Sequence, residues 1–305
     1  MAAVVRALGI EGLTEAALRA DQARYQEVEV RAALADVRGM PFRWALNPYR
    51  GCTHACTYCY ARKYQRHLEL DAGDDFSSLI LVKINLARVL AREIGRPSWG
   101  RETVAIGTAT DPYQPIEGHY KLTRQSAALL AGSRTPFSVV TKGPMVVRDT
   151  DVFQEAMKAA GCEILVSVPT VDETAWPRLE PGAAPPLQRL RAIEHLTNAG
   201  IDTGVLMMPL VAGVSTSRSA IERTLVAIRD SGARFVGANV ARFDPGVREY
   251  FFDFLGREYP HLLPGYERLY TRTSARPDYE RQIKARVNDA AERIGLRKDA
   301  RRRDR

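Results

Sequence analysis

Apolar runs alternate with amphipathic segments over most of the chain, and each kind of segment predicts a different element. Six runs are mainly apolar rather than alternating, as in strands that are buried on both faces, and they span residues 42–46, 103–107, 137–142, 163–168, 203–208 and 235–240. Helical periodicity and helix-end signals fall between them, at residues 85–94, 123–130, 151–160, 186–199 and 217–230. This alternation predicts an α/β fold built on a parallel sheet.

Six strand–helix units predict a partial (β/α)6 barrel, because a complete barrel needs eight. An open doubly wound sheet is the alternative, but no Gly-x-Gly-x-x-Gly sequence follows the first strand. We expect helical additions at both ends: residues 1–40 as an N-terminal cap, residues 41–245 as the barrel core, and residues 246–305 as a helical extension with a basic tail. No linker rich in Gly or Ser separates these parts, so the sequence predicts one compact domain.

The composition agrees with this predicted fold, and the net charge indicates a class of binding partner. Hydrophobic residues make up 45% of the chain and charged residues 26%, which is ordinary for a soluble globular protein, and no stretch approaches the ~20 apolar residues of a membrane helix. The first residues lack a secretory signal, so we expect a cytoplasmic protein. The formal net charge of +8 favours DNA or RNA as a partner. Exposed arginines and the tail at residues 297–305 are the alternative source of this charge.

Three of the four cysteines lie on one short segment, at Cys52, Cys56 and Cys59. Three thiolates so spaced can bind three corners of a 4Fe–4S cluster and leave the fourth iron open to a small molecule. Zinc is the alternative, but a structural zinc site takes four ligands. His54 lies between two of the cysteines, and no second Cys/His cluster follows. A disulfide would leave one thiol unpaired. The pattern therefore favours an iron–sulfur cluster.

The Cys-x3-Cys-x2-Cys segment after the first strand of a six-unit β/α protein resembles the radical S-adenosylmethionine superfamily and implies its type of partial barrel. Residues 48–52, Pro-Tyr-Arg-Gly-Cys, and residues 56–62, Cys-Thr-Tyr-Cys-Tyr-Ala-Arg, resemble the branch that contains spore photoproduct lyase. The resemblance implies a 4Fe–4S cluster on the three cysteines, with S-adenosylmethionine bound at the open iron. It also implies an electron donor of the flavodoxin or ferredoxin type, reductive cleavage to a 5′-deoxyadenosyl radical, and hydrogen abstraction.

The resemblance assigns further residues to S-adenosylmethionine. Thr110 and Asp111 match the place of the motif that binds the methionine amino group, and a hydroxyl and an acid can accept hydrogen bonds from an ammonium. It implies that Lys142 binds the methionine carboxylate, Ser167 the ribose, and Arg189 the nucleoside. The structural alternatives are a capped turn for Asp111, a surface position for Lys142 and a satisfied core hydroxyl for Ser167.

Tyr58 and Tyr60 flank Cys59 and could pack against the cluster and adenine. The resemblance to the photoproduct lyases implies that one of them relays hydrogen, and ordinary packing is the alternative for at least one. Photoproduct lyases place a hydrogen-donating cysteine near the position where this chain has Thr108. We expect the spare thiol, Cys162, to be buried at the opposite end of the barrel, so spore photoproduct repair itself is not expected. No additional Cys-rich domain for auxiliary clusters is present in the sequence.

The sequence thus predicts a radical S-adenosylmethionine enzyme that abstracts hydrogen from a substrate, with nucleic acid favoured over a metabolite or peptide. A hypothesis of a different class is a non-catalytic iron–sulfur or zinc protein that binds nucleic acid.

Overall fold

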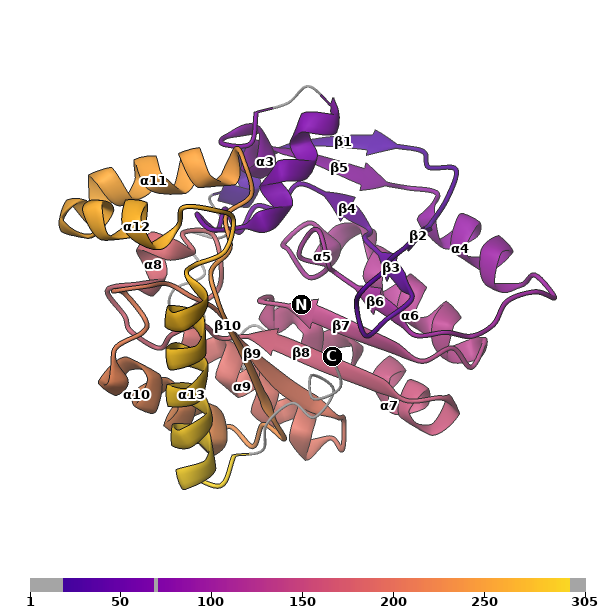
Figure 1. Ribbon diagram of the computed structural model, residues 1–305. Coiled ribbons are helices and arrows are strands. Elements are labelled where there is room, and N and C mark those ends of the chain that lie inside the picture. Colours follow the sequence, from indigo (N-terminus) through magenta and orange to yellow (C-terminus); the bar gives the residue numbers. More distant parts are fainter. Residues whose placement is uncertain (1–18, 69–70, 297–305) are drawn as a thin grey trace.

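The computed structural model describes residues 19–68 and 71–296, and its centre is a seven-stranded sheet. Six strands run parallel in the order β10-β9-β8-β7-β6-β3, and β2 pairs antiparallel with β3 at one edge. The strands are β2 (Leu34–Asp36), β3 (Trp44–Leu46), β6 (Val104–Ile106), β7 (Phe137–Thr141), β8 (Cys162–Ser167), β9 (Thr203–Leu210) and β10 (Val236–Val240). The parallel strands are the six that the apolar runs predict, which confirms the partial (β/α)6 barrel (Figure 1).

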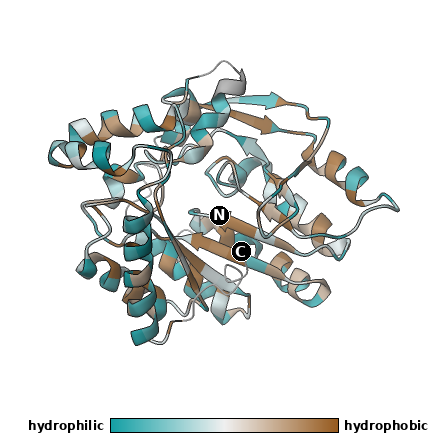
Figure 2. Ribbon diagram, viewed as in Figure 1, coloured by the Kyte–Doolittle hydropathy of each residue, from teal (hydrophilic) through white to brown (hydrophobic). Residues whose placement is uncertain are grey.

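Amphipathic helices follow the parallel strands and pack against the sheet and one another. In α4 the buried residues are Leu86, Val89, Leu90 and Ile94, a spacing that places them on one face. The strands are mainly hydrophobic, whereas the helices carry both hydrophobic and hydrophilic positions (Figure 2). The helices of the barrel are α4 (Leu86–Ile94), α5 (Glu117–Tyr120), α6 (Leu122–Gly132), η2 (Pro144–Asp149), α7 (Thr150–Ala159), α8 (Trp176–Leu179), α9 (Pro186–Asn198) and α10 (Arg218–Asp230).

A second, three-stranded sheet lies beside the barrel (Figure 1). It has the order β1-β5-β4, with β1 (Arg24–Val28) parallel and β4 (Tyr49–Arg50) antiparallel to β5 (Leu79–Lys83). The apolar run at residues 79–82 therefore belongs to this sheet and not to the barrel. Residues 19–40 supply the edge strands β1 and β2. Between the two sheets the chain passes from β3 to β4, and this passage delivers the cysteine segment to the carboxyl end of the barrel.

The C-terminal region is helical and closes one side of the barrel. It contains α11 (Val247–Glu258), η3 (Pro260–Leu262), α12 (Leu263–Leu269) and α13 (Pro277–Arg293). Phe243, Phe251, Tyr266 and Tyr270 pack as one aromatic cluster beneath α11 and α12. The helix α13 contacts the edge strand β10 and α10 (Figure 1). No helix within the described residues is long and apolar enough to span a membrane.

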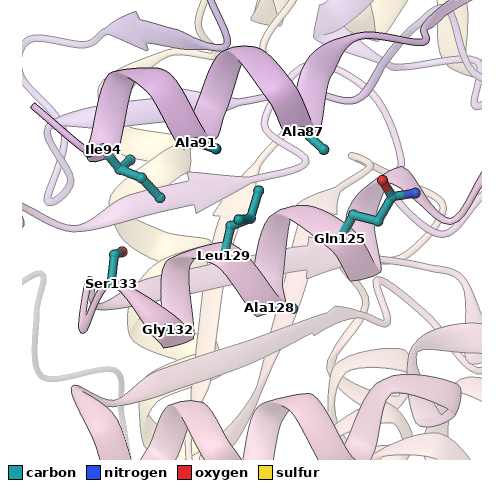
Figure 3. A pocket seen from close by; sticks show the side chains of 9 residues that line it. Ala87, Ala91, Ile94, Gln125, Ala128, Leu129, Gly132 and Ser133 are labelled. Carbon is teal, nitrogen blue, oxygen red and sulfur yellow. The ribbon is translucent and has the colours of Figure 1, made fainter.

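One hollow lies among the outer helices rather than at the carboxyl end of the strands. It lies between α4 and α6, which also contact each other, and its lining includes the apolar residues Ala91, Ile94 and Leu129 (Figure 3). None of the candidate site residues lines it.

Candidate active site

The cysteine loop, residues 51–59, begins directly after β4. Gly51 turns the chain there with a φ of +83°, in the left-handed region that favours glycine. A Cβ at this position would also lie 2.5 Å from the carbonyl oxygen of Leu79, so a larger residue would displace the loop. All the cysteines of the loop are free thiols, with Cys52 and Cys56 buried and Cys59 partly exposed.

Arg62 supports the cysteine loop by donating hydrogen bonds to carbonyl groups of the loop. Its side chain is fully buried, and its guanidinium donates to the carbonyl oxygens of Ala55 at 3.1 Å and Cys56 at 3.0 Å. The same guanidinium lies 4.1 Å from the ring centroid of Tyr250 on α11. A buried arginine needs partners for its donors, and here the cysteine loop supplies two of them. The loop is therefore tied to the C-terminal helices.

Thr110 and Gln114 hold the first turn of the cysteine loop. The hydroxyl of Thr110 donates to the carbonyl oxygen of Gly51 at 2.6 Å. The side-chain amide of Gln114 donates to that carbonyl at 3.3 Å and to Thr110 Oγ1 at 3.0 Å, and its oxygen accepts from the N–H of Thr53 at 3.1 Å. The side chains of Thr110 and Gln114 are buried. Thr110 thus lies beside the cysteines, as expected, and bonds to the loop that carries them.

Asp111 joins the cysteine loop to the end of β7. Its carboxylate accepts hydrogen bonds from the hydroxyl of Thr141 and the N–H of Lys142, both at 2.6 Å, and from the N–H of Tyr113 at 2.9 Å. His54 Nδ1 lies 3.3 Å from Asp111 Oδ2. Burial by itself would raise the pKa of Asp111, but His54 and these hydrogen bonds lower it to about 2. The carboxylate is therefore ionised and surrounded by donors of the protein.

Glu180 is the centre of a charge cluster with Tyr58 and Arg189, which are buried, and Lys142, which is partly buried. Its Oε1 accepts a hydrogen bond from the hydroxyl of Tyr58 and lies 3.8 Å from Lys142 Nζ, and its Oε2 lies 2.5 Å from Arg189 Nη2. Burial opposes ionisation of Glu180, but Arg189 and Lys142 lower its pKa below the ordinary value. Burial likewise lowers the pKa of Lys142, but Cys56 and Glu180 raise it above the ordinary value. Both groups are therefore charged.

The segment that carries Glu180 is pressed against the cysteine loop. The N–H of Gly182 donates to the carbonyl oxygen of His54 at 3.0 Å, and the N–H of Thr57 donates to that of Leu179 at 2.9 Å. A Cβ on Gly182 would lie only 2.1 Å from the carbonyl oxygen of Thr53. This close approach keeps the cysteines and the charge cluster in one unit.

Ser167 and Arg189 meet at the carboxyl end of β8. The carbonyl oxygen of Ser167 accepts from Arg189 Nη1 at 3.1 Å, and the carbonyl oxygen of Ala184 accepts from Arg189 Nε at 2.7 Å. With Glu180 on Nη2, all three nitrogens of the guanidinium contact protein groups. Arg189 is fully buried, so in this structure it positions Glu180 and the strand end.

Three residues lie apart from this charge cluster. Tyr60 is 45% exposed and its ring packs edge-on against Tyr64, whereas Tyr58 is buried. The hydroxyl of Thr108 accepts from Asn47 Nδ2 at 3.2 Å. Cys162 lies at the first residue of β8, the end of the strand opposite to Ser167, and its burial raises the pKa of the thiol to about 12. The expectation that Cys162 is buried at the opposite end is confirmed.

The three thiols of the cysteine loop fit an iron–sulfur cluster. Burial, followed by Asp111 and the other two cysteines, raises the pKa of Cys52 well above its ordinary value, so the thiols lie close enough to repel one another when ionised. A cation-rich cluster would relieve that repulsion. Within the described residues no three His, Cys, Asp or Glu side chains converge on a point that could hold a single metal ion. The three cysteines that hold a 4Fe–4S cluster each bind a different iron, so they need not converge on a single point.

Three supporting residues escape the sequence analysis. Gln114 and Glu180 lie in loops that contain proline, where a polar residue is ordinarily exposed to solvent. Arg62 falls in a segment that the sequence predicts to be helical, where an arginine is ordinarily on the surface. A weak signal exists for Glu180, which stands in a Leu-Glu-Pro-Gly sequence shortly before Arg189. A carboxylate so near a predicted site arginine is a candidate partner for it.

Known proteins are similar to this chain in sequence. A family model described as the Radical SAM superfamily matches residues 46–248. An uncharacterised protein of Mycobacterium tuberculosis is 36% identical over 287 residues, which cover 93% of this chain and 82% of the relative. An uncharacterised protein of Methanocaldococcus jannaschii is 24% identical, over 81% of this chain and 85% of the relative. A protein of Pseudomonas phage M6 named a Radical SAM Nalpha-GlyT isomerase is 26% identical over 55% of this chain and 33% of its own.

Solved structures share the whole fold. Spore photoproduct lyase superposes with a TM-score of 0.69 over 95% of this chain and 86% of its own, at 16% sequence identity. One of these structures, of a double mutant, contains bound AdoMet and a dinucleoside spore photoproduct. The family match over most of the chain, together with the braced cysteine loop at the carboxyl end of a partial barrel, shows that this protein belongs to the Radical SAM superfamily, whose enzymes use a 4Fe–4S cluster and S-adenosylmethionine.

Proposed function

We propose that this protein is a single-cluster radical S-adenosylmethionine enzyme whose substrate is a nucleic acid. Cys52, Cys56 and Cys59 would hold the cluster. When bound, the cluster and S-adenosylmethionine supply a 5′-deoxyadenosyl radical, which abstracts a hydrogen atom from the substrate. The observation that carries the proposal is the juxtaposition of three free thiols with the partly buried cation of Lys142, whose charge interacts with Cys56 and Cys59.

Lys142 is suited to bind the methionine carboxylate because its ion pair with Glu180 is loose. The two charged atoms are 3.8 Å apart, whereas Arg189 approaches the other oxygen of Glu180 to 2.5 Å. When the carboxylate of S-adenosylmethionine arrives, Lys142 can therefore turn to it while Arg189 keeps Glu180 neutralised. Glu180 would thus be a stand-in anion that keeps Lys142 charged and aimed before the cofactor binds.

The other site residues are proposed to act at separate parts of the cofactor. Thr110 and Asp111 would serve the methionine end by fixing the cysteine loop and the backbone of Lys142. Ser167, buried at the end of β8, would face the ribose. Tyr58 is favoured over Tyr60 for a part in the reaction, because Tyr58 is buried against Glu180 whereas Tyr60 is largely exposed.

Relatives named for a reaction include a lyase and an isomerase, so the fate of a substrate radical differs among proteins similar to this one. A nucleic-acid substrate is supported by the net charge of +8 and by the dinucleoside bound in spore photoproduct lyase. The four cysteines of the chain leave no thiol for the final hydrogen transfer, since three lie on the cluster loop and Cys162 lies at the far end of β8. The reductant would be a protein of the flavodoxin or ferredoxin type.

Anaerobic reconstitution tests the proposal. After loading with iron and sulfide, dithionite and S-adenosylmethionine should yield 5′-deoxyadenosine, detected by chromatography. Cys52→Ala should lose both bound iron and this product. Cys162→Ala is the matched control and should retain both, because Cys162 is remote from the loop. A protein with a full cluster that releases no 5′-deoxyadenosine would refute the enzymatic proposal and favour a non-catalytic iron–sulfur protein.

A further inference from the structure

A groove runs between the edge strand β10 and the first turns of α13. Its volume is about 360 Å³, and its floor includes the apolar residues Leu210, Val240 and Ile283. Arg242, Arg281 and Lys284 stand around it with exposed side chains. Arg281 and Lys284 are three residues apart on α13, so they project from the same helix face. In Figure 2 this helix is hydrophilic over much of its length.

The neighbouring arginines of α13 have ion-pair or hydrogen-bond partners, whereas the cations of this groove have none among the described side chains. On α13 and at its start, Arg276 pairs with Asp278, Arg286 donates to the carbonyl oxygen of Thr216, and Arg293 pairs with Glu222. In contrast, no ion pair or side-chain hydrogen bond between described residues involves Arg242, Arg281 or Lys284. Glu280 is the one carboxylate among the residues that line the groove. The groove therefore carries excess positive charge that no carboxylate of the described residues neutralises by an ion pair.

The groove lies at the reactive end of the barrel. Leu210 and Val240 are the last residues of β9 and β10, and Arg242 lies two residues after Val240. The carboxyl ends of parallel strands meet at one end of the barrel, which is also where the cysteine loop and Lys142 lie. The edge strand β10 is covered by α13, so a long ligand would lie along the groove between these two elements.

We propose that the groove between β10 and α13 binds the phosphate backbone of a nucleic acid strand and leads that strand to the cysteine loop. This inference rests on the proposed function and adds a location to it. Guanidinium and ammonium groups bind phosphate oxygens through charge-assisted hydrogen bonds without reading the base sequence. The cations stand in the open along two elements and do not converge inside an enclosed pocket. That arrangement fits successive phosphates of a strand better than one small phosphorylated molecule.

The test is the salt dependence of binding by the reconstituted enzyme. A fluorescein-labelled single-stranded oligonucleotide is titrated in fluorescence anisotropy at several salt concentrations. Each phosphate contact contributes about 0.7 to the slope of log K against log salt for a single strand, so the double variant Arg281→Gln/Lys284→Gln should flatten the slope by about 1.4. The matched control Arg88→Gln/Arg234→Gln removes the same charge from cations that pair with Glu29 and Asp202, and it should change the slope little.

Three outcomes would overturn the inference. Equal slope changes in both double variants would mean that only net charge matters, and no change in either would place the strand elsewhere. Inorganic tripolyphosphate that competes as well as the oligonucleotide, per phosphate, would indicate a site for small anions. Formation of 5′-deoxyadenosine without substrate is measured in parallel. Its absence in the unmodified enzyme would count against the proposed function, whereas a steep salt slope that neither double variant changes, with normal 5′-deoxyadenosine, would count against the groove alone.

Discussion

At the scale of single residues, the site depends on buried charges that are held by partners. Glu180 is 2% exposed and Arg189 is fully buried, and each would be costly to bury alone. Around them Tyr58 and Lys142 complete a set in which every charge has an opposite neighbour. Glu180 is the anion that Lys142 and Arg189 share, so its removal leaves both cations without a counter-charge.

Glu180→Gln should therefore destabilise the protein without cofactors, by about 3 kcal/mol, because Lys142 and Arg189 would lose their buried anion. Urea unfolding measures this change. Glu222→Gln, which removes an exposed anion paired with Arg218 and Arg293, should change the urea midpoint far less, because solvent screens exposed ion pairs. A second measurement compares the two proteins with the cluster loaded, with and without S-adenosylmethionine. The cofactor should stabilise Glu180→Gln more than the unmodified protein. In the variant its carboxylate supplies the anion that Lys142 lacks, whereas in the unmodified protein Lys142 must first leave Glu180. Equal stabilisation would contradict the exchange of partners by Lys142.

The carboxylate of Asp111 predicts a pH dependence of stability. Its pKa is about 2 in the folded protein and 3.8 in the unfolded reference. A depressed carboxyl pKa stabilises the fold above the unfolded value, and this stabilisation is lost as pH falls from near 4 to near 2. The difference corresponds to about 2 kcal/mol. Asp111→Asn should thus be less stable by about this amount near pH 7, and urea midpoints should show the gap closing towards about pH 3. A gap of the same size at both pH values would contradict this assignment.

At the scale of elements, the cysteine loop is held from several sides. Arg62 bonds its carbonyls, Thr110 and Gln114 hold its first turn, and the segment from Leu179 to Gly182 lies against it. The loop forms no helix or strand, and its own backbone hydrogen bonds are those of turns, such as Ala55 N–H to the carbonyl oxygen of Cys52. The contacts with other segments therefore fix where its thiols lie. Cluster binding should then be sensitive to changes in the contacting segments.

Gly182→Ala tests that dependence. Its Cβ would lie 2.1 Å from the carbonyl oxygen of Thr53, so the loop must shift, at a cost of about 1–3 kcal/mol. Iron bound per chain after reconstitution should fall, although no cysteine is changed. Gly132→Ala is the matched control: a Cβ there meets no atom within 4 Å, and the helix α6 favours alanine. Full iron content in Gly182→Ala would show that the loop tolerates displacement.

At the scale of the whole molecule, two sheets and the C-terminal helices converge on the cysteine loop. The large sheet brings Lys142 and Ser167 to its carboxyl end, the small sheet delivers Gly51, and α11 reaches Arg62 through Tyr250. The helix α13 then forms one wall of the cationic groove on the open side. The proposed site therefore draws on segments from the first strand of the barrel to the last long helix.

The sequence by itself determined the six parallel strands, their order along the chain and the cysteine segment. These are local properties, because a buried strand is a short apolar run and a cluster loop is a short spacing of thiols. Only the tertiary structure decided the partners. Tyr58 and Glu180 are 122 residues apart in the chain, and Thr53 and Gln114 are 61 apart. No local pattern specifies which distant carboxylate or amide a buried donor will meet. Such pairs depend on how the two sheets bring the loops together at one end of the barrel. The same is true of the groove and its cations, which have no ion-pair partner among the described residues.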